Sequence, residues 1–152
     1  MESLEFPSSR RGAVDDRGAP HRSMESAELW TIGERFIGAW NSQVVDDVVA
    51  CYTRDLVYID PNTHGPVEGA DAMGRYLTKL FGRWQMHWTI KEIFPLADSA
   101  PGGAILWRAS LALPGGDKAV EVDGMDLVVL DGVKIKRNEV YFDRAVLASL
   151  MS

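Results

Sequence analysis

The sequence predicts an α+β fold, a cone-shaped barrel in which three N-terminal helices pack on one face of a curved, mostly antiparallel sheet. Two patterns predict it. Apolar residues recur every three or four positions through the first half of the chain, as in amphipathic helices. The second half instead alternates apolar and polar residues in long runs, separated by turns rich in Gly, Pro and Asp. Helices followed by consecutive strands are typical of α+β domains rather than of alternating α/β domains.

The composition indicates one globular domain behind an N-terminal leader. Residues 1–23 are rich in Ser, Arg, Gly and Pro, so we expect a disordered leader there and a single domain over residues 24–152. A formal charge of -6, without a basic stripe, argues against nucleic acid as a partner. The chain has no apolar run long enough for a membrane span or a secretory signal. With one cysteine, Cys51, which cannot form an internal disulfide, we expect a cytoplasmic protein with no membrane partner.

Three helices are predicted from apolar stripes. The first begins near Ser26 and ends at Asn41-Ser42, the second opens at Asp46-Asp47, and the third ends near Trp84. Their apolar positions are, in chain order, Leu29, Ile32, Gly33, Phe36, Ile37 and Trp40; Val45, Val48, Val49 and Tyr52; and Met73, Tyr76, Leu77, Leu80, Phe81 and Trp84. Each stripe is expected to face the sheet.

Five strands complete the prediction. A short β-branched and aromatic run at residues 56–60 lies between the second and third helices. The other four strands are expected at residues 86–96, 104–113, 118–130 and 133–142. The Asp131-Gly132 pair between the last two runs is the strongest hairpin signal in the chain. The sheet is therefore expected to be an antiparallel meander with one short strand inserted early.

Asp60, at the end of the first predicted strand, is the most informative single residue. A carboxylate held against apolar neighbours has a raised pKa and is a candidate general base. An aspartate before a proline is also a common way to start a turn, because the ring of Pro61 pushes the preceding residue towards extended geometry. The sequence leaves both interpretations open.

Asp126 is a second candidate, because it is the lone charge in an apolar row. Strand alternation places it on one face with Val120, Val122, Gly124, Val128 and Leu130. An unpaired carboxyl group there would lose its hydration and stay protonated, as a hydrogen-bond donor. The alternatives are an ion pair with Arg108 or Arg137, or a bulge at Gly124 that turns Asp126 outward.

The histidines give no indication of a metal site. His21, His64 and His87 lack the spacing of metal ligands, and we expect neither metal nor cofactor. His87 is either a second proton carrier that faces the cavity or an ordinary surface histidine.

Several motifs in the right order resemble one known superfamily. They are residues 36–41, 48–61 and 68–69, then 122–135 and 139–143. In this order the runs look like the nuclear transport factor two-like superfamily, and most like its SnoaL-like branch, which is similar to polyketide cyclases and ketosteroid isomerases. The resemblance runs from about residue 26 to the C-terminus. Within this fold we expect a homodimer, formed through the sheet face that the helices leave uncovered.

The resemblance implies roles for particular residues. Steroid ketoisomerases pair a base aspartate with a tyrosine and a protonated aspartic acid. Asp60 falls on the base position and Asp126 on the acid position, but Phe36 occupies the tyrosine position and cannot donate a hydrogen bond. A substitute donor would have to come from Tyr58, Tyr141 or Trp40. We expect the substrate to contact Phe36, Trp40, Tyr58, Trp88, Trp107 and His87.

The leading function hypothesis is a cofactor-independent general acid/base enzyme, of the isomerase or cyclase type, that acts on a small apolar carbonyl-bearing molecule. One alternative is a hydrolase or dehydratase that activates water with the same carboxylates. The epoxide hydrolases of this superfamily do so with an Asp-Arg-Asp set, which would require Arg108 to enter the cone. The other alternative is a dimeric domain that binds a small ligand without catalysis.

Overall fold

The computed structural model describes residues 24–97 and 100–151. The predicted leader at residues 1–23 lies outside the described residues. The helices are α1 (Ser26–Ser42), α2 (Val45–Val49), α3 (Ala70–Arg83), a 3-10 helix η1 (Arg144–Leu147) and α4 (Ala148–Met151). The strands are β1 (Tyr52–Ile59), β2 (Val67–Glu68), β3 (Gln85–Pro95), β4 (Gly102–Ala112), β5 (Ala119–Asp131) and β6 (Lys134–Phe142).

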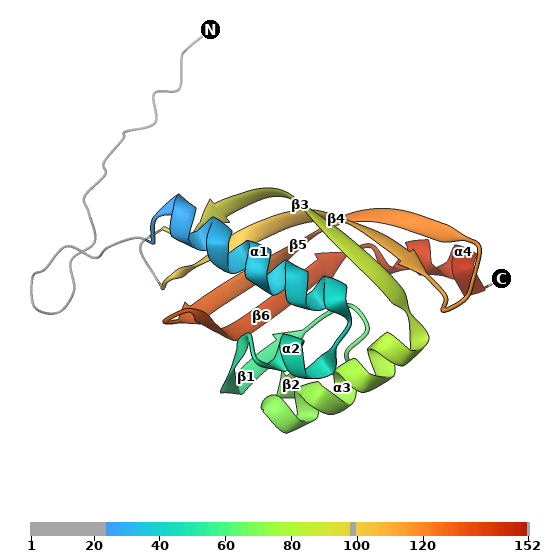
Figure 1. Cartoon of the computed structure of the whole chain (residues 1–152), viewed down its shortest axis with the longest axis horizontal. Helices are drawn as coiled ribbons and strands as arrows, with labels where there is room; N and C mark the ends of the chain where they lie inside the picture. The colour runs from blue at the N-terminus through green and yellow to red at the C-terminus, as the bar shows by residue number, and fades with distance from the viewer. Residues whose placement is uncertain (1–23, 98–99, 152) are drawn as a thin grey trace, which may run out of the picture.

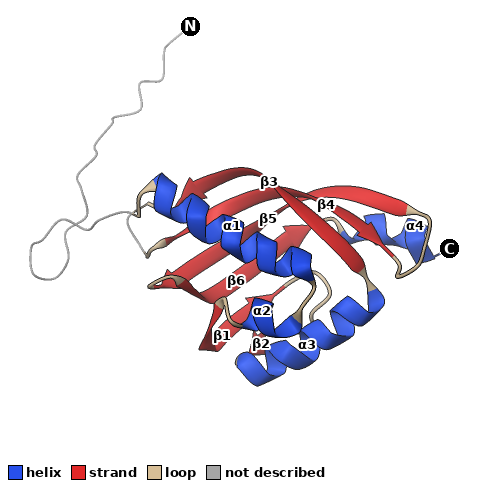
Figure 2. Ribbon diagram, in the orientation of Figure 1, coloured by secondary structure: helices blue, strands red, loops and turns tan. Residues whose placement is uncertain are grey.

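The strands form one six-stranded sheet in the order β2-β1-β6-β5-β4-β3. Every neighbouring pair is antiparallel except β1 and β6, which run parallel. Figures 1 and 2 show α1 crossing the curved sheet, where it packs mainly on β3, while α3 lies against β1, β2 and α2. The predicted α+β architecture is confirmed.

Helix α1 forms as its apolar stripe predicts. The residues buried on it are the six from which the helix was predicted: Leu29, Ile32, Gly33, Phe36, Ile37 and Trp40. The helix ends at Gln43, whose left-handed backbone (φ 53°) lets its N–H bond to the carbonyl of Trp40. Side-chain amides of Asn41 and Gln43 then bond to backbone groups of β3, which ties the helix end to the sheet.

The structure differs from the prediction at some element boundaries. Strand β1 begins at Tyr52, which was assigned to the second helix, because α2 stops at Val49 and Tyr52 pairs with Ile135 of β6. The two-residue β2 and the C-terminal helices were not predicted. These elements are too short to carry a period, so only their tertiary contacts define them.

The C-terminal helices η1 and α4 pack on β5. The side chain of Asp143 accepts a hydrogen bond from the backbone N–H of Ala145 (2.9 Å) and so starts η1. Leu147 and Leu150 are buried and anchor η1 and α4 to the core. Within the described ranges, no helix is long and apolar enough to cross a bilayer.

Candidate functional site

The carboxylate of Asp60 is buried at the end of β1, with 7% of the residue exposed. Its Oδ1 accepts hydrogen bonds from the backbone N–H groups of Asn62 (2.7 Å) and Thr63 (3.1 Å). The Thr63 hydroxyl in turn donates to the carbonyl of Asp60 (2.9 Å). This oxygen therefore organises the turn, as one of the two interpretations predicted.

The second oxygen of Asp60 faces two phenols. Oδ2 accepts a hydrogen bond from the hydroxyl of Tyr58 (2.7 Å), which is buried on β1, and another from the hydroxyl of Tyr76, which is half-buried on α3. Burial, reinforced by the nearby Asp60 carboxylate, raises the pKa of both tyrosines above the ordinary value. Both phenols therefore keep their protons at neutral pH and act as donors.

Asp60 lies on the wall of a small inner cavity of about 40 Å³. A space of this size admits a water molecule or two rather than an organic ligand. Four of the predicted substrate contacts, Trp40, Tyr58, Trp88 and Trp107, line it, together with Asn62, Leu80, Met86, Ala109, Leu111, Val122, Val140 and Phe142. Aromatic side chains thus form much of its wall, with Trp40 stacked on Tyr58 and edge-on to Trp88.

Two of the predicted substrate contacts lie elsewhere. Phe36 is fully buried against Trp40 and Tyr52 and does not line the cavity. His87 is exposed, because strand alternation turns Met86 and Trp88 inward and His87 outward, so the expectation that it faces the cavity does not hold.

Arg108 does not enter the cone. Its guanidinium bonds to the carboxylate of Asp123 on the outer face of the sheet (2.9 Å), and about half of each side chain is exposed. The alternation of β4 directs Trp107 and Ala109 inward and Arg108 outward. The Asp-Arg-Asp arrangement considered for water activation is therefore absent from this site.

Asp126 is buried on the inward face of β5, as the strand alternation predicted, and it forms no ion pair with a described residue. The indole Nε1 of Trp107 donates to its Oδ1 (2.8 Å), and the amide of Asn138 donates to its Oδ2 (3.2 Å). Burial raises the pKa of Asp126 to about 6, although both hydrogen bonds lower it, because loss of hydration disfavours the charged form. The carboxyl group lies behind Trp107 and is not part of the cavity wall.

The two alternatives for Asp126 are excluded. Arg108 and Arg137 pair instead with Asp123 and Glu139. The pairing of β4 with β5 is regular through Gly124, so no bulge there turns Asp126 outward.

Residues 33–138 match the family described as the SnoaL-like domain.

The chain belongs to the SnoaL-like domain family. The resemblance seen in the sequence motifs is thereby confirmed over most of the domain. No curated protein sequence matches the chain. Three solved structures similar to this SnoaL-like domain are each less than 25% identical to it, so they support the fold and not a particular activity.

These three structures come from proteins of different kinds that share the fold. A protein from Catenulispora acidiphila with a ketosteroid isomerase-like fold, in complex with trimethylamine, is 17% identical with a TM-score of 0.69, covering 79% of this chain and 92% of that one. A putative polyketide cyclase from a Silicibacter species is 14% identical with a TM-score of 0.71, covering 85% and 98%. An epoxide hydrolase from M. tuberculosis is 21% identical with a TM-score of 0.66, covering 84% and 92%.

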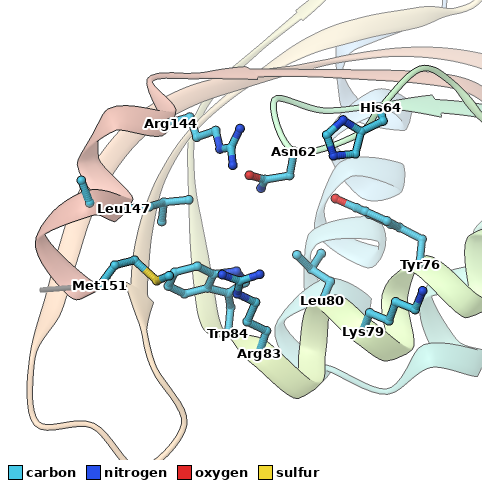
Figure 3. A pocket seen from close by; sticks show the side chains of 11 residues that line it. Asn62, His64, Tyr76, Lys79, Leu80, Arg83, Trp84, Arg144, Leu147 and Met151 are labelled. Carbon is cyan, nitrogen blue, oxygen red and sulfur yellow. The ribbon is translucent and has the colours of Figure 1, made fainter.

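A larger outer pocket of about 430 Å³ adjoins the inner cavity of the SnoaL-like domain (Figure 3). Asn62 and Leu80 line both spaces, and Tyr76, the partner of Asp60, lines the outer one. The remaining lining residues come from α3, the turn after Asp60 and the C-terminal helices: His64, Lys79, Arg83, Trp84, Arg144, Leu147, Ala148 and Met151. Its volume is within the range of small-molecule sites.

Sequence reasoning missed two polar residues of this SnoaL-like domain. Tyr76 was counted only as an apolar position of α3, although its hydroxyl reaches Asp60. Asn138 is fully buried between Asp126 and the hydroxyl of Tyr52, which donates to it (2.7 Å). Asn138 is a polar residue within the last predicted strand, and this was a usable signal. However, the pairing of β6 with β5 is irregular just before Asn138, which disturbs the alternation there. The described residues hold no group of three or more His, Cys, Asp or Glu that could bind a metal ion.

Proposed function

We propose that the domain is a general acid/base enzyme that abstracts a proton next to the carbonyl of a small, mostly apolar molecule, with Asp60 as the base. The observation that carries this proposal is the position of Oδ2 of Asp60. It is buried beside the inner cavity, and one of its two phenol partners, Tyr76, lines the outer pocket. A buried carboxylate next to hydroxyl donors is the pairing that enolisation requires.

The proposed reaction begins with an exchange of hydrogen-bond partners. In the free enzyme both oxygens of Asp60 accept two hydrogen bonds each, which occupies its lone pairs. The hydroxyl of Tyr76 turns from Asp60 to the carbonyl oxygen of the substrate, and Oδ2 becomes free to accept a proton. Tyr76 then supplies the donor that Phe36 cannot, and its raised pKa keeps it protonated.

The steps balance without a redox change. Oδ2 of Asp60 takes the proton from carbon, and the electron pair of the C–H bond moves into an enolate stabilised by Tyr76. In isomerisation, the protonated Asp60 returns the proton to another carbon. In cyclisation, the enolate attacks a second carbonyl of the same molecule, and the new alkoxide takes the proton.

Asp126 acts on this site through Trp107 in our proposal, as a positioning residue. The hydrogen bond from the indole to Oδ1 holds Trp107 in the cavity wall. The role of acid or oxyanion donor, which the resemblance implies for Asp126, would require its carboxyl group to reach past that indole.

Exchange of α-protons tests the reaction without knowledge of the natural substrate. We expect the protein to accelerate deuterium incorporation into 1-tetralone in D2O, followed by NMR. Asp60→Asn should lower the rate about 10²- to 10⁴-fold, the range typical of general-base catalysis. Tyr76→Phe should lower it about 10²- to 10³-fold, the range typical of one oxyanion donor.

Asp55→Asn is the matched control, because Asp55 lies on the same strand and is exposed. It should exchange like the wild type. A wild-type rate that equals the buffer rate, or that survives Asp60→Asn, would overturn the proposal.

A ligand-binding domain without catalysis is the second candidate. The observation that favours it is the full set of hydrogen bonds on Asp60, which a purely structural carboxylate would also have. This candidate predicts that 1-tetralone binds and is not exchanged, which the same NMR experiment detects.

We further propose that the domain functions as a homodimer.

A further inference from the structure

The outer pocket has a lining of one charge sign. Its ionisable lining residues other than Tyr76 are all basic: His64, Lys79, Arg83 and Arg144. Among the residues that the structure describes, no aspartate or glutamate lines it, although the whole sequence has a formal charge of -6. Positive charge is thus concentrated in this concave surface against the balance of the molecule.

These cations have no acidic partners among the described residues. The ion pairs of that part of the chain, Lys91–Asp123, Arg108–Asp123 and Arg137–Glu139, involve none of the pocket residues. Arg83 lies over the ring of Trp84, 5.7 Å from its centroid. Three exposed cations that converge on one hollow repel one another, and an anion placed between them relieves that repulsion.

The cations come from two sides of the pocket. Lys79 and Arg83 are one turn apart on α3, while Arg144 belongs to η1. Figure 3 shows Arg144 on the side of the pocket opposite Lys79, with the apolar side chains of Leu80, Leu147 and Met151 around the space between them. An apolar wall with basic groups around it suits an amphipathic anion better than a free inorganic ion.

The basic groups would also offset the repulsion between an anionic substrate and the neighbouring carboxylate of Asp60. An anionic substrate would be repelled by the carboxylate of Asp60, which lies just beyond Tyr76. Cations that bind the charged end of the substrate offset this repulsion. The carbonyl end can then approach Tyr76 while the charged end stays in the outer pocket.

We propose that the outer pocket binds substrates that carry an anionic group, a carboxylate or a phosphate, on an apolar carbonyl-bearing body. The charged end contacts Lys79, Arg83 and Arg144. This inference rests on the proposed function, because it names the substrate class of the same site.

Matched naphthalene probes test the inference. Isothermal titration at low salt compares 1-naphthylacetate and 1-naphthyl phosphate with the uncharged 1-naphthylacetamide. With up to three cations near one anion, we expect at least one charged probe to bind about tenfold more tightly than the amide. That preference should shrink as sodium chloride is raised, because salt screens exposed charges. The charged probe that binds more tightly shows whether the pocket prefers a carboxylate or a phosphate.

Substitution of the pocket cations tests whether the preference for the charged probe arises at the outer pocket. Lys79→Gln combined with Arg83→Gln should weaken binding of the charged probe about tenfold, while binding of the amide changes less than about twofold. Unchanged amide binding also shows that the double variant is folded. Arg75→Gln is the matched control, since Arg75 is exposed on the same helix outside the outer pocket, and it should bind like the wild type.

Three outcomes would overturn the inference: equal affinity for charged and uncharged probes, a preference that the double variant keeps, or no binding of any probe at millimolar concentration. Asp60→Asn separates this inference from the proposed function, because the variant should keep the preference for an anion. If the protein prefers the anion but does not exchange 1-tetralone, only the catalytic proposal is contradicted. If exchange depends on Asp60 but the protein does not prefer the anion, only this inference is contradicted.

Discussion

Asp60 shows how one carboxylate can hold a turn and still be available as the base that we propose. The sequence left open whether Asp60 is a turn residue or a catalytic base. In the structure Oδ1 bonds to the backbone of the turn, and Oδ2 bonds to Tyr58 and Tyr76. The turn therefore fixes the carboxylate in place, which is what a positioned base needs.

Asp126 should give the protein a characteristic pH dependence of stability. Its pKa rises from an ordinary value of 3.8 to about 6 in the folded protein. The folded state therefore holds the proton more tightly, so this group stabilises fully below about pH 4, and the contribution is lost as pH rises through about 6. The shift corresponds to about 3 kcal/mol.

Urea unfolding of the wild type and of Asp126→Asn at several pH values measures this effect. Between about pH 4 and pH 7, the wild type should lose about 3 kcal/mol of unfolding free energy relative to the variant, which cannot titrate at this position. Parallel stability profiles for the two proteins would show that Asp126 does not titrate differently in the folded and unfolded states.

At the level of elements, the contact between β4 and β5 depends on the absence of a side chain. Trp107 pairs with Gly124, and a Cβ at Gly124 would lie 2.4 Å from the Trp107 ring and 2.7 Å from the carbonyl oxygen of Tyr141. The glycine thus provides the space in which the indole reaches Asp126.

Gly124→Ala should therefore destabilise the protein by about 1–3 kcal/mol, the usual cost of overpacking, even though alanine is the better strand former. Thermal or urea unfolding measures the loss. Gly38→Ala is the control, because Gly38 is exposed in α1 with nothing within 4 Å of an added Cβ. There we expect a gain of about 0.5–1 kcal/mol. Equal stability of Gly124→Ala and the wild type would contradict the packing argument.

Helix α3 connects the two spaces of the site. Tyr76, Leu80 and Arg83 are spaced by three or four residues and so share one helix face. That face carries the partner of Asp60 at one end and the cations of the outer pocket at the other. A small rotation of α3 would therefore move the phenol and the cations together.

At the scale of the whole molecule, the outer sheet face has a half-buried apolar patch. Leu106 pairs with Met125, which pairs with Tyr141, and Ala104 pairs with Leu127 on the same face. Tyr141 is 53% exposed. We expect this patch to form the interface of the proposed homodimer.

Sedimentation velocity tests the dimer. The wild type should sediment with about twice the chain mass of 16.8 kDa. Met125→Glu should shift the equilibrium to monomer, because it would bury a charge in the interface. Val133→Glu should remain dimeric, since Val133 is exposed in the turn between β5 and β6 and lies outside the patch. A wild type that is monomeric at all concentrations would remove the dimer.

The longer helices and strands, and the faces that they bury, could be predicted from the sequence alone. The six buried residues of α1 and the inward row of β5 with Asp126 follow from periods of 3.6 and 2, which are local properties of the chain. The motif order was also sufficient for the family, because it spans most of the domain.

Which side chains meet depends on the tertiary packing. Tyr76 lies 16 residues from Asp60, and Trp107 lies 19 residues from Asp126. Neither pairing has a local signal, since each depends on the order of strands in the sheet and on how α3 packs against β1. The outer pocket likewise forms only because residues of α3 and of the C-terminal helices, distant in sequence, line one space. A period reveals which face is buried, whereas the partner across that face is set by packing between segments distant in sequence.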